Sequence, residues 1–270
     1  MTEANKCIDI EKIFREKNPR LARFIPRLLM NYIRKIIHED EVNDFLHTHG
    51  GKMNLEFVQA GIQAFKVKVA SKGTENIPSD GGFIIAGNHP LGGLDAFALM
   101  QEVSKKRMDI KFIVNDILMQ LKNMQGLFIG VNKHGKNAQE NLLAIDALYA
   151  SDSGVFIFPA GLVSRKQNGI IKDLPWQKSF ITKAKKHHRN IIPVHVEGHL
   201  TKRFYNFANL RAALNIKSNI EMFFLADELF KQENKTISIT FGKPISYTVF
   251  DKTKTDFEWA QWVKERVYSL

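Results

Sequence analysis

The sequence predicts an α/β protein with a mostly parallel central sheet flanked by helices, behind an N-terminal amphipathic helical segment. Short apolar runs of strand length alternate with helical patterns along most of the chain, which is typical of a parallel sheet. Between Leu21 and Ile37, apolar residues recur at helical spacing and basic residues occupy the other face. We find no internal repeat or long linker. We therefore expect a helical segment over residues 1–64 and an α/β domain over residues 65–270.

The N-terminal segment is expected to form helices at residues 8–14, 21–37 and 40–63. Pro26 should kink or split the second helix because proline removes a backbone donor. The third helix should break near Gly50 and Gly51. A basic amphipathic helix at residues 21–37 is typical of a membrane-interface segment. The alternative is a helix packed on the domain core with a solvated basic face.

Strands and helices alternate in the second part of the chain. Phe65–Val69 alternates apolar and polar residues, as a half-buried strand does, and the apolar run Phe83–Ala86 is typical of a buried strand. Further strands are expected at residues 111–114, 127–129, 154–158, 191–196 and 236–241. Helices are expected from Asp95 onward and at residues 117–122, 139–149, 180–187, 204–214, 227–232 and 257–267, with a mixed stretch at 221–226.

Composition limits the class of protein. The chain has 270 residues, of which 44% are hydrophobic and 25% charged, as in globular proteins. The single Cys7 excludes a disulfide framework and favours a reducing compartment. We find neither a signal-peptide core nor an apolar run of spanning length. The net charge of +11 indicates an anionic partner, such as nucleic acid, a membrane surface, or a phosphorylated or acyl-carrier substrate.

The first candidate site follows the strand at residues 83–86. His89 and Asp95 flank a turn in which Pro90, Gly92 and Gly93 allow a tight bend, so the carboxylate can fold back toward the imidazole. A neutral imidazole held by a carboxylate can take a proton from a hydroxyl. The alternative is an exposed loop histidine followed by an ordinary helix cap, and spacing by itself favours that alternative.

A second loop, at residues 130–137, nearly matches the phosphate-binding pattern G-x-x-x-x-G-K-[ST]. Asn137 replaces the hydroxyl residue that would hold magnesium, and no later strand ends in an acidic ligand, so nucleotide hydrolysis is a weak alternative. Lys133 and Lys136 could instead line an anion site near a helix start. A lysine-rich surface turn is the other interpretation.

A third loop, at residues 158–166, combines the small Gly161 with the cationic Arg165, so its backbone N–H groups could serve a developing oxyanion. Ser164 is not in a G-x-S-x-G elbow, and a serine nucleophile has no support. The alternative is a plain strand-to-loop turn with a solvated arginine.

One more group could suggest a metal. His195, Glu197 and His199 share one face of a strand, but a single strand aims too few ligands for a metal site. We therefore expect no metal.

The order of these loops resembles the glycerolipid (lysophospholipid) acyltransferase family over roughly residues 65–245. The matching blocks are Asn88-His89…Asp95, Gly126-Leu127-Phe128-Ile129…Lys133, Phe158-Pro159-Ala160-Gly161…Arg165 and Ile192-Pro193-Val194. Five residues rather than four separate the histidine from the aspartate, Ala160 replaces a glutamate, and the arginine is displaced. With these differences, the motifs resemble those of a divergent bacterial branch of the family. That branch includes proteins labelled hemolysins and enzymes that O-acylate lyso forms of ornithine or glycine aminolipids.

The resemblance implies transfer of a fatty acyl group from acyl-carrier protein or acyl-CoA to a hydroxyl of a lyso-lipid, with no other cofactor. His89 would be the general base and Asp95 its orienting carboxylate. The resemblance and the loops together predict these substrate-binding residues: Asn88, Gly92, Gly93, Asn132, Lys133, Lys136, Gly161, Ser164 and Arg165.

The predicted partners are the lyso-lipid, the acyl thioester and an anionic membrane surface, with the protein cytoplasmic and peripheral at the inner face of the cytoplasmic membrane. An inactive basic membrane-binding module is the alternative function. Nucleic acid is not expected because no recognised binding motif occurs.

Overall fold

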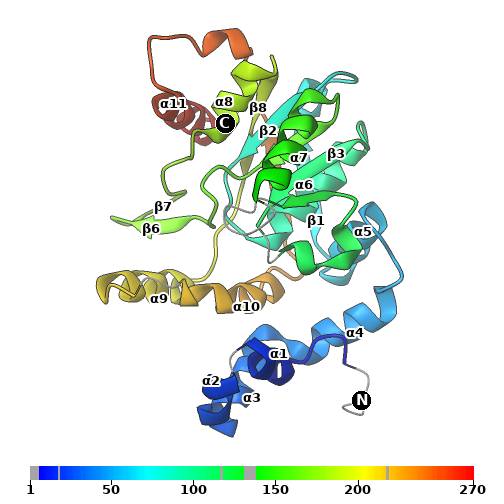
Figure 1. Cartoon of the computed structure of the whole chain (residues 1–270), viewed down its shortest axis with the longest axis vertical. Coiled ribbons are helices and arrows are strands. Elements are labelled where there is room, and N and C mark those ends of the chain that lie inside the picture. The colour runs from blue at the N-terminus through cyan, green and yellow to red at the C-terminus, as the bar shows by residue number, and fades with distance from the viewer. Residues whose placement is uncertain (1–5, 18, 116–117, 131–137, 217–218) are drawn as a thin grey trace. The chain divides into compact units, whose positions relative to one another are not determined.

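A computed structural model describes residues 6–17, 19–115, 118–130, 138–216 and 219–270 (Figure 1). The chain divides into two compact units, one of Met1–Lys52 and Thr201–Glu233 and the other of Met53–Leu200 and Asn234–Leu270. The N-terminal helices thus form a unit with a later segment of the chain.

The first unit is helical. Its helices are α1 (Ile10–Lys17), α2 (Pro19–Phe24), α3 (Arg27–Ile37), α4 (Glu39–His49), α9 (Lys202–Ala213) and α10 (Leu225–Phe230), with the 3₁₀ helix η5 (Ile220–Phe224). The predicted helix 21–37 is split at Pro26, which directly precedes α3 with extended backbone angles. The His38 ring stacks on Phe230 at 4.0 Å, and its Nε2 lies 3.2 Å from Asp227. These contacts join the N-terminal helices to α10.

The second unit contains a seven-stranded sheet with the strand order β1-β9-β8-β2-β5-β3-β4. The strands are β1 (Lys68–Lys72), β2 (Phe83–Gly87), β3 (Ile110–Val114), β4 (Phe128–Gly130), β5 (Gly154–Ile157), β8 (Asn190–Val196) and β9 (Thr236–Phe241). All neighbouring pairs are parallel except β8 with β9. The predicted fold class, a mostly parallel sheet flanked by helices, is confirmed.

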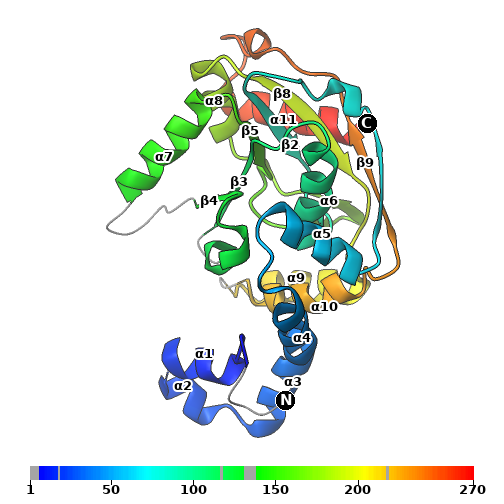
Figure 2. The ribbon, with the colours of Figure 1, turned by 90° about the vertical axis from the view of Figure 1, so that its right-hand side faces the viewer.

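Helices cover the sheet. Those on one face are α7 (Ala138–Ala150), α8 (Ser179–Lys186) and α11 (Asp256–Tyr268), whose apolar residues form one buried cluster with Ile84, Val155 and Ile191. Figure 2 shows α5 (Leu55–Ala64) and α6 (Gly93–Ser104) in front of the strands, with α11 behind them. A Cβ on Gly61 of α5 would lie 2.6 Å from the Phe97 ring of α6, so the two helices pack closely.

Two local predictions differ from the structure. Strand β1 begins at Lys68 rather than at Phe65, because α5 runs on to Ala64 and Lys66 takes a left-handed conformation (φ 49°). The predicted helix at 117–122 is instead two 3₁₀ turns, η3 (Leu118–Gln120) and η4 (Lys122–Met124).

A hairpin absent from the prediction begins within the third loop. It consists of β6 (Arg165–Gln167) and β7 (Ile170–Lys172), which pair antiparallel. Asn168 and Gly169 form its two-residue turn, both with positive φ. The Asn-Gly dipeptide is a strong hairpin signal, and the strands are so short that the periodicity conceals them. Asp173 directly follows β7.

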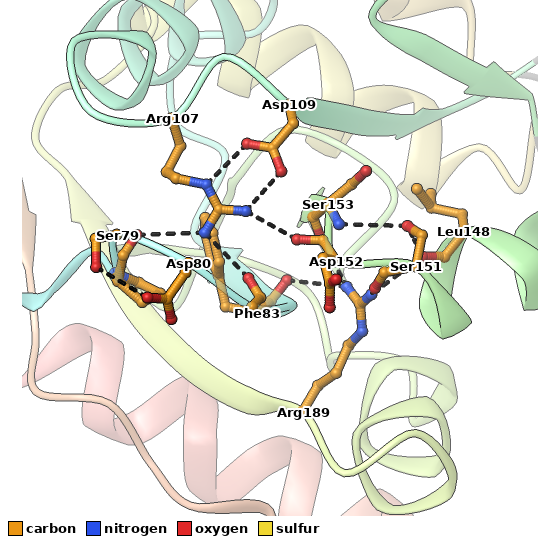
Figure 3. Close-up of polar contacts among 12 residues, drawn as sticks. Ser79, Asp80, Phe83, Arg107, Asp109, Leu148, Ser151, Asp152, Ser153 and Arg189 are labelled. Carbon is orange, nitrogen blue, oxygen red and sulfur yellow. Dashed lines mark hydrogen bonds and ion pairs between the residues drawn. The ribbon is translucent and has the colours of Figure 1, made fainter.

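Two buried arginines join the amino ends of the strands (Figure 3). Arg107 holds Asp109 with two hydrogen bonds of 2.8 and 2.6 Å and donates to backbone carbonyls, including that of Asp152 at 2.8 Å. Arg189 donates to the carbonyls of Ser153 at 2.7 Å and Leu148 at 3.1 Å, and also to that of Ser151. Because the guanidinium groups satisfy carbonyls at strand and helix ends, they stabilise this edge of the sheet.

No helix among the described residues combines the length and the apolar character needed to cross a bilayer.

Candidate active site

His89 and Asp95 meet at the carboxyl end of the central strand β2. The imidazole Nδ1 lies 2.7 Å from Asp95 Oδ2. Asp95 is the third residue of α6 and is completely buried. Its carboxylate accepts the backbone N–H groups of Leu91 at 3.0 Å and Gly92 at 3.1 Å, so the turn between strand and helix folds around it. The longer histidine–aspartate spacing is accommodated by Gly92, whose φ of +80° few other residues adopt.

A histidine whose Nδ1 contacts a buried carboxylate has the geometry in which an imidazole can act as a base. Burial raises the pKa of Asp95 above its ordinary value, while the hydrogen bond with His89 opposes that rise. A carboxylate at Nδ1 holds the proton on that nitrogen, which leaves Nε2 as the basic atom. Nε2 has no hydrogen-bond partner among the residues that the structure describes. The ring stacks on Phe158 at 4.1 Å and remains 18% exposed, so a substrate can reach it.

Asn88 fixes the loop to the neighbouring strand β8. Its side-chain amide donates to the carbonyl of Val196 at 2.9 Å and accepts the Val196 N–H at 2.7 Å. Both polar ends of the side chain are therefore used in holding the loop. Gly93, which follows the loop in the chain, is the first residue of α6.

The third loop packs against the first. Ser164 donates its N–H to the carbonyl of His89 at 2.8 Å, and its hydroxyl donates to Asp173 at 2.6 Å. Gly161, with a φ of +70°, donates its N–H to the Phe158 carbonyl at 2.9 Å, and a Cβ at Gly161 would face open space. Arg165 is buried and donates to the Val163 carbonyl at 2.7 Å. In this structure, the Gly161 N–H and the Arg165 guanidinium thus each bond to a backbone carbonyl of the same loop.

Of the predicted site residues, three lie outside the described chain. Asn132, Lys133 and Lys136 fall within residues 131–137, immediately before α7. The sequence-based proposal of an anion site at these lysines stays a prediction.

A small cavity lies on the β8 side of the loop at residues 88–92, which we call the His89 loop. Its volume is about 150 Å³. It is lined by Asn88, Pro90, Ser164, Ile171, His195, Val196, Glu197, Gly198 and Tyr268. Burial lowers the pKa of His195, which favours the neutral imidazole.

Across the described residues, no group of three or more histidine, cysteine or acidic side chains is arranged to hold a metal ion.

Sequence reasoning missed several residues that complete the site. Asp173 and Trp176 follow the unexpected hairpin, and Tyr268 comes from the last turn of α11. The Asn168-Gly169 pair could have revealed the hairpin. No spacing rule could have indicated Asp173 or Tyr268, because only the folded chain brings them to the His89 loop.

Comparisons with known proteins identify the family of this chain. An acyltransferase family model matches residues 12–270. Lyso-glycine lipid O-acyltransferases of Bacteroides thetaiotaomicron and Phocaeicola vulgatus are each 44% identical over 97% of this chain, covering 97% and 95% of their own lengths. The crystal structure of the 1-acyl-sn-glycerophosphate acyltransferase PlsC from Thermotoga maritima is similar in fold, with a TM-score of 0.50 and 16% identity over 95% of this chain and 86% of PlsC. The chain therefore belongs to the acyltransferase family and is an O-acyltransferase.

Proposed function

We propose that the protein transfers a fatty acyl group from an acyl thioester to the hydroxyl of a lyso-aminolipid, of the lyso-glycine lipid type. The acceptor follows from the two relatives that are named for this activity and match this chain over nearly its whole length. The observation that carries the mechanism is the 2.7 Å contact between His89 Nδ1 and the buried Asp95, which leaves Nε2 available as a base. The donor is acyl-carrier protein or acyl-CoA, and both anionic carriers suit a chain of net charge +11.

In the proposed reaction, His89 Nε2 removes the proton of the acceptor hydroxyl as the oxygen attacks the thioester carbonyl carbon. Asp95 stabilises the imidazolium that forms and keeps its ring in place. The tetrahedral intermediate then collapses: the carbon–sulfur bond breaks, and the imidazolium returns its proton to the leaving thiolate. The products are an ester, a free thiol and the regenerated imidazole.

The test is consumption of an acyl thioester by the purified protein with and without a lyso-glycine lipid. We expect thiol release only when the acceptor is present, together with formation of the O-acylated lipid, because the imidazole activates the acceptor hydroxyl. Supplying acyl-CoA and acyl-carrier protein in separate reactions identifies the donor. Lyso-phosphatidic acid in place of the lyso-glycine lipid tests the acceptor class. Protein that binds anionic liposomes yet consumes neither thioester with any acceptor would support the inactive membrane-binding module instead.

We also propose that the first unit contacts the membrane surface on which the acceptor lipid lies. Phe24 and Leu28 are 79% and 84% exposed at the junction of α2 and α3, and the exposed Leu29 and Tyr32 continue this apolar surface along α3. Basic residues accompany them, Arg23 in α2 and Arg27 at the start of α3. Exposed apolar residues beside cations favour insertion into an anionic interface.

Replacing Leu28 by glutamate should weaken this binding, because a carboxylate is unfavourable near both the acyl chains and the anionic headgroups. We expect a clear fall in the fraction of protein that floats with phosphatidylglycerol-containing liposomes. Met108→Glu is the matched control. Met108 is likewise a highly exposed apolar residue, at 73%, but it lies in the second unit. If the two variants float equally well, the proposed surface is wrong.

A further inference from the structure

Asp173 is a second buried carboxylate beside the His89 loop. It is 3% exposed and directly follows β7. Its Oδ1 accepts the backbone N–H of His89 at 3.2 Å and the hydroxyl of Ser164 at 2.6 Å. Its Oδ2 accepts the indole N–H of Trp176 at 2.9 Å. Within the described chain, this carboxylate forms no ion pair and is held by neutral donors.

These bonds close a ring around the main chain of His89. The His89 N–H is bound by Asp173, and the His89 carbonyl accepts the N–H of Ser164 at 2.8 Å. The Ser164 hydroxyl returns to the same oxygen of Asp173. The peptide groups on both sides of His89 are therefore fixed by one carboxylate and its serine partner, while Asp95 fixes the side chain.

Asp173 also connects this ring to the C-terminal helix. Its backbone N–H donates to the Tyr268 hydroxyl at 2.8 Å, and its carbonyl accepts from Lys264 Nζ at 2.7 Å. Both partners belong to α11. The position of Asp173 thus depends on the packing of the last helix of the chain as well as on the hairpin.

A carboxylate is the side chain that these donors require. Burying an unpaired charge is unfavourable unless hydrogen bonds replace its lost hydration. An ionised carboxylate has only acceptor atoms, so a side chain of this type can satisfy all three donors together. An asparagine would turn an NH₂ group toward either the Trp176 N–H or the two donors at Oδ1. The side-chain bonds of Asp173 that the structure describes therefore serve to hold the loop.

We infer that Asp173 is a positioning residue for His89, acting through the main chain of the catalytic loop. This inference rests on the general-base role proposed above for His89. If Asp173 had only a structural role, replacing it would change the fraction of protein that folds. If it positions His89, replacing it changes the turnover of the protein that does fold. Small displacements of a catalytic group reduce the rate strongly while substrate affinity changes little.

The experiment compares Asp173→Asn with Glu102→Gln. Glu102 is the matched control because it is also a buried carboxylate of the second unit, held by Ser71 at 2.7 Å and Lys105 at 2.6 Å near the other end of α6. The readouts on folded protein are kcat, KM for both substrates, and the low-field proton NMR signal of the His89 Nδ1–H, assigned by its loss in His89→Ala. For Asp173→Asn we expect kcat to fall by about 10–100-fold, each KM to change by less than about 3-fold, and the His89 signal to shift.

Glu102→Gln should leave kcat and the His89 signal unchanged. The inference is overturned if kcat of Asp173→Asn equals that of the control, or if it falls while the His89 signal stays in place. Should Asp173→Asn fail to fold, Tyr268→Phe removes the hydroxyl bound by the Asp173 N–H. That variant should lower kcat by about 2–10-fold with a shifted signal, and unchanged values would overturn the inference. Full activity of His89→Ala would instead refute the proposed mechanism, whatever Asp173→Asn shows.

Discussion

Replacing His89 by alanine is expected to reduce acyl transfer by about 10²–10⁴-fold, because the variant lacks the proposed general base for the acceptor hydroxyl. The fold should tolerate the change. The imidazole is partly exposed and contacts the protein mainly through Asp95 and the Phe158 ring. The measurement is initial thiol release from the acyl thioester at saturating lyso-lipid, normalised to the protein that remains folded by circular dichroism.

The matched control for this variant is His187→Ala. His187 also pairs with an aspartate, Asp146, through its Nε2 at 3.0 Å, but it lies at the end of α8. Its loss should leave turnover within about 3-fold of the wild type, because it removes a single hydrogen bond outside the turn that holds His89 and Asp95. Wild-type turnover by folded His89→Ala would end the general-base assignment.

Replacing Asp95 by asparagine should produce the second-largest loss, about 10²-fold in turnover. The asparagine oxygen can still accept from His89 Nδ1 and from the Gly92 N–H, so the ring keeps a partner. The variant instead loses the negative charge that, in the proposed mechanism, stabilises the imidazolium as the hydroxyl proton is transferred. Residual activity should therefore exceed that of His89→Ala.

The stability of this variant separates chemistry from folding. Because burial raises the pKa of Asp95, the folded state favours its neutral form, and the ionised form costs free energy at neutral pH. Removing the charge should thus leave the midpoint of thermal unfolding unchanged or higher, and any benefit should diminish as pH falls and the wild-type carboxyl protonates. A variant with full turnover would show that the charge of Asp95 has no part in the reaction.

Sequence reasoning predicted the fold class because its signals are local. Apolar strands between amphipathic helices indicate a parallel sheet wherever they occur, and Pro26 divides α2 from α3 as its missing donor requires. The grouping of Thr201–Glu233 with the N-terminal helices has no such signal. It depends on contacts such as that of His38 with Asp227, which are 189 positions apart in the chain.

The candidate site shows the same division. The glycines and the proline of one short turn allow His89 and Asp95 to meet, and the resemblance to the acyltransferase family, rather than the spacing by itself, predicts that they do. The bonds that define the surroundings of this pair connect distant segments: Asn88 with β8, and Asp173 with both the His89 loop and α11. The resemblance and the loops together predict that Asn88 and Arg165 bind substrate. In the structure the side chain of each bonds to a backbone carbonyl, and their contact with substrate stays a prediction.

The two arginines at the amino ends of the strands have a consequence for how this enzyme can diversify. Arg107 and Arg189 bind the sheet at the edge opposite the loop of His89, largely through carbonyl groups that every amino acid provides. Changes in the loops at the carboxyl ends leave these bonds intact. New acceptor preferences can therefore evolve at one edge of the sheet while the other keeps the scaffold foldable.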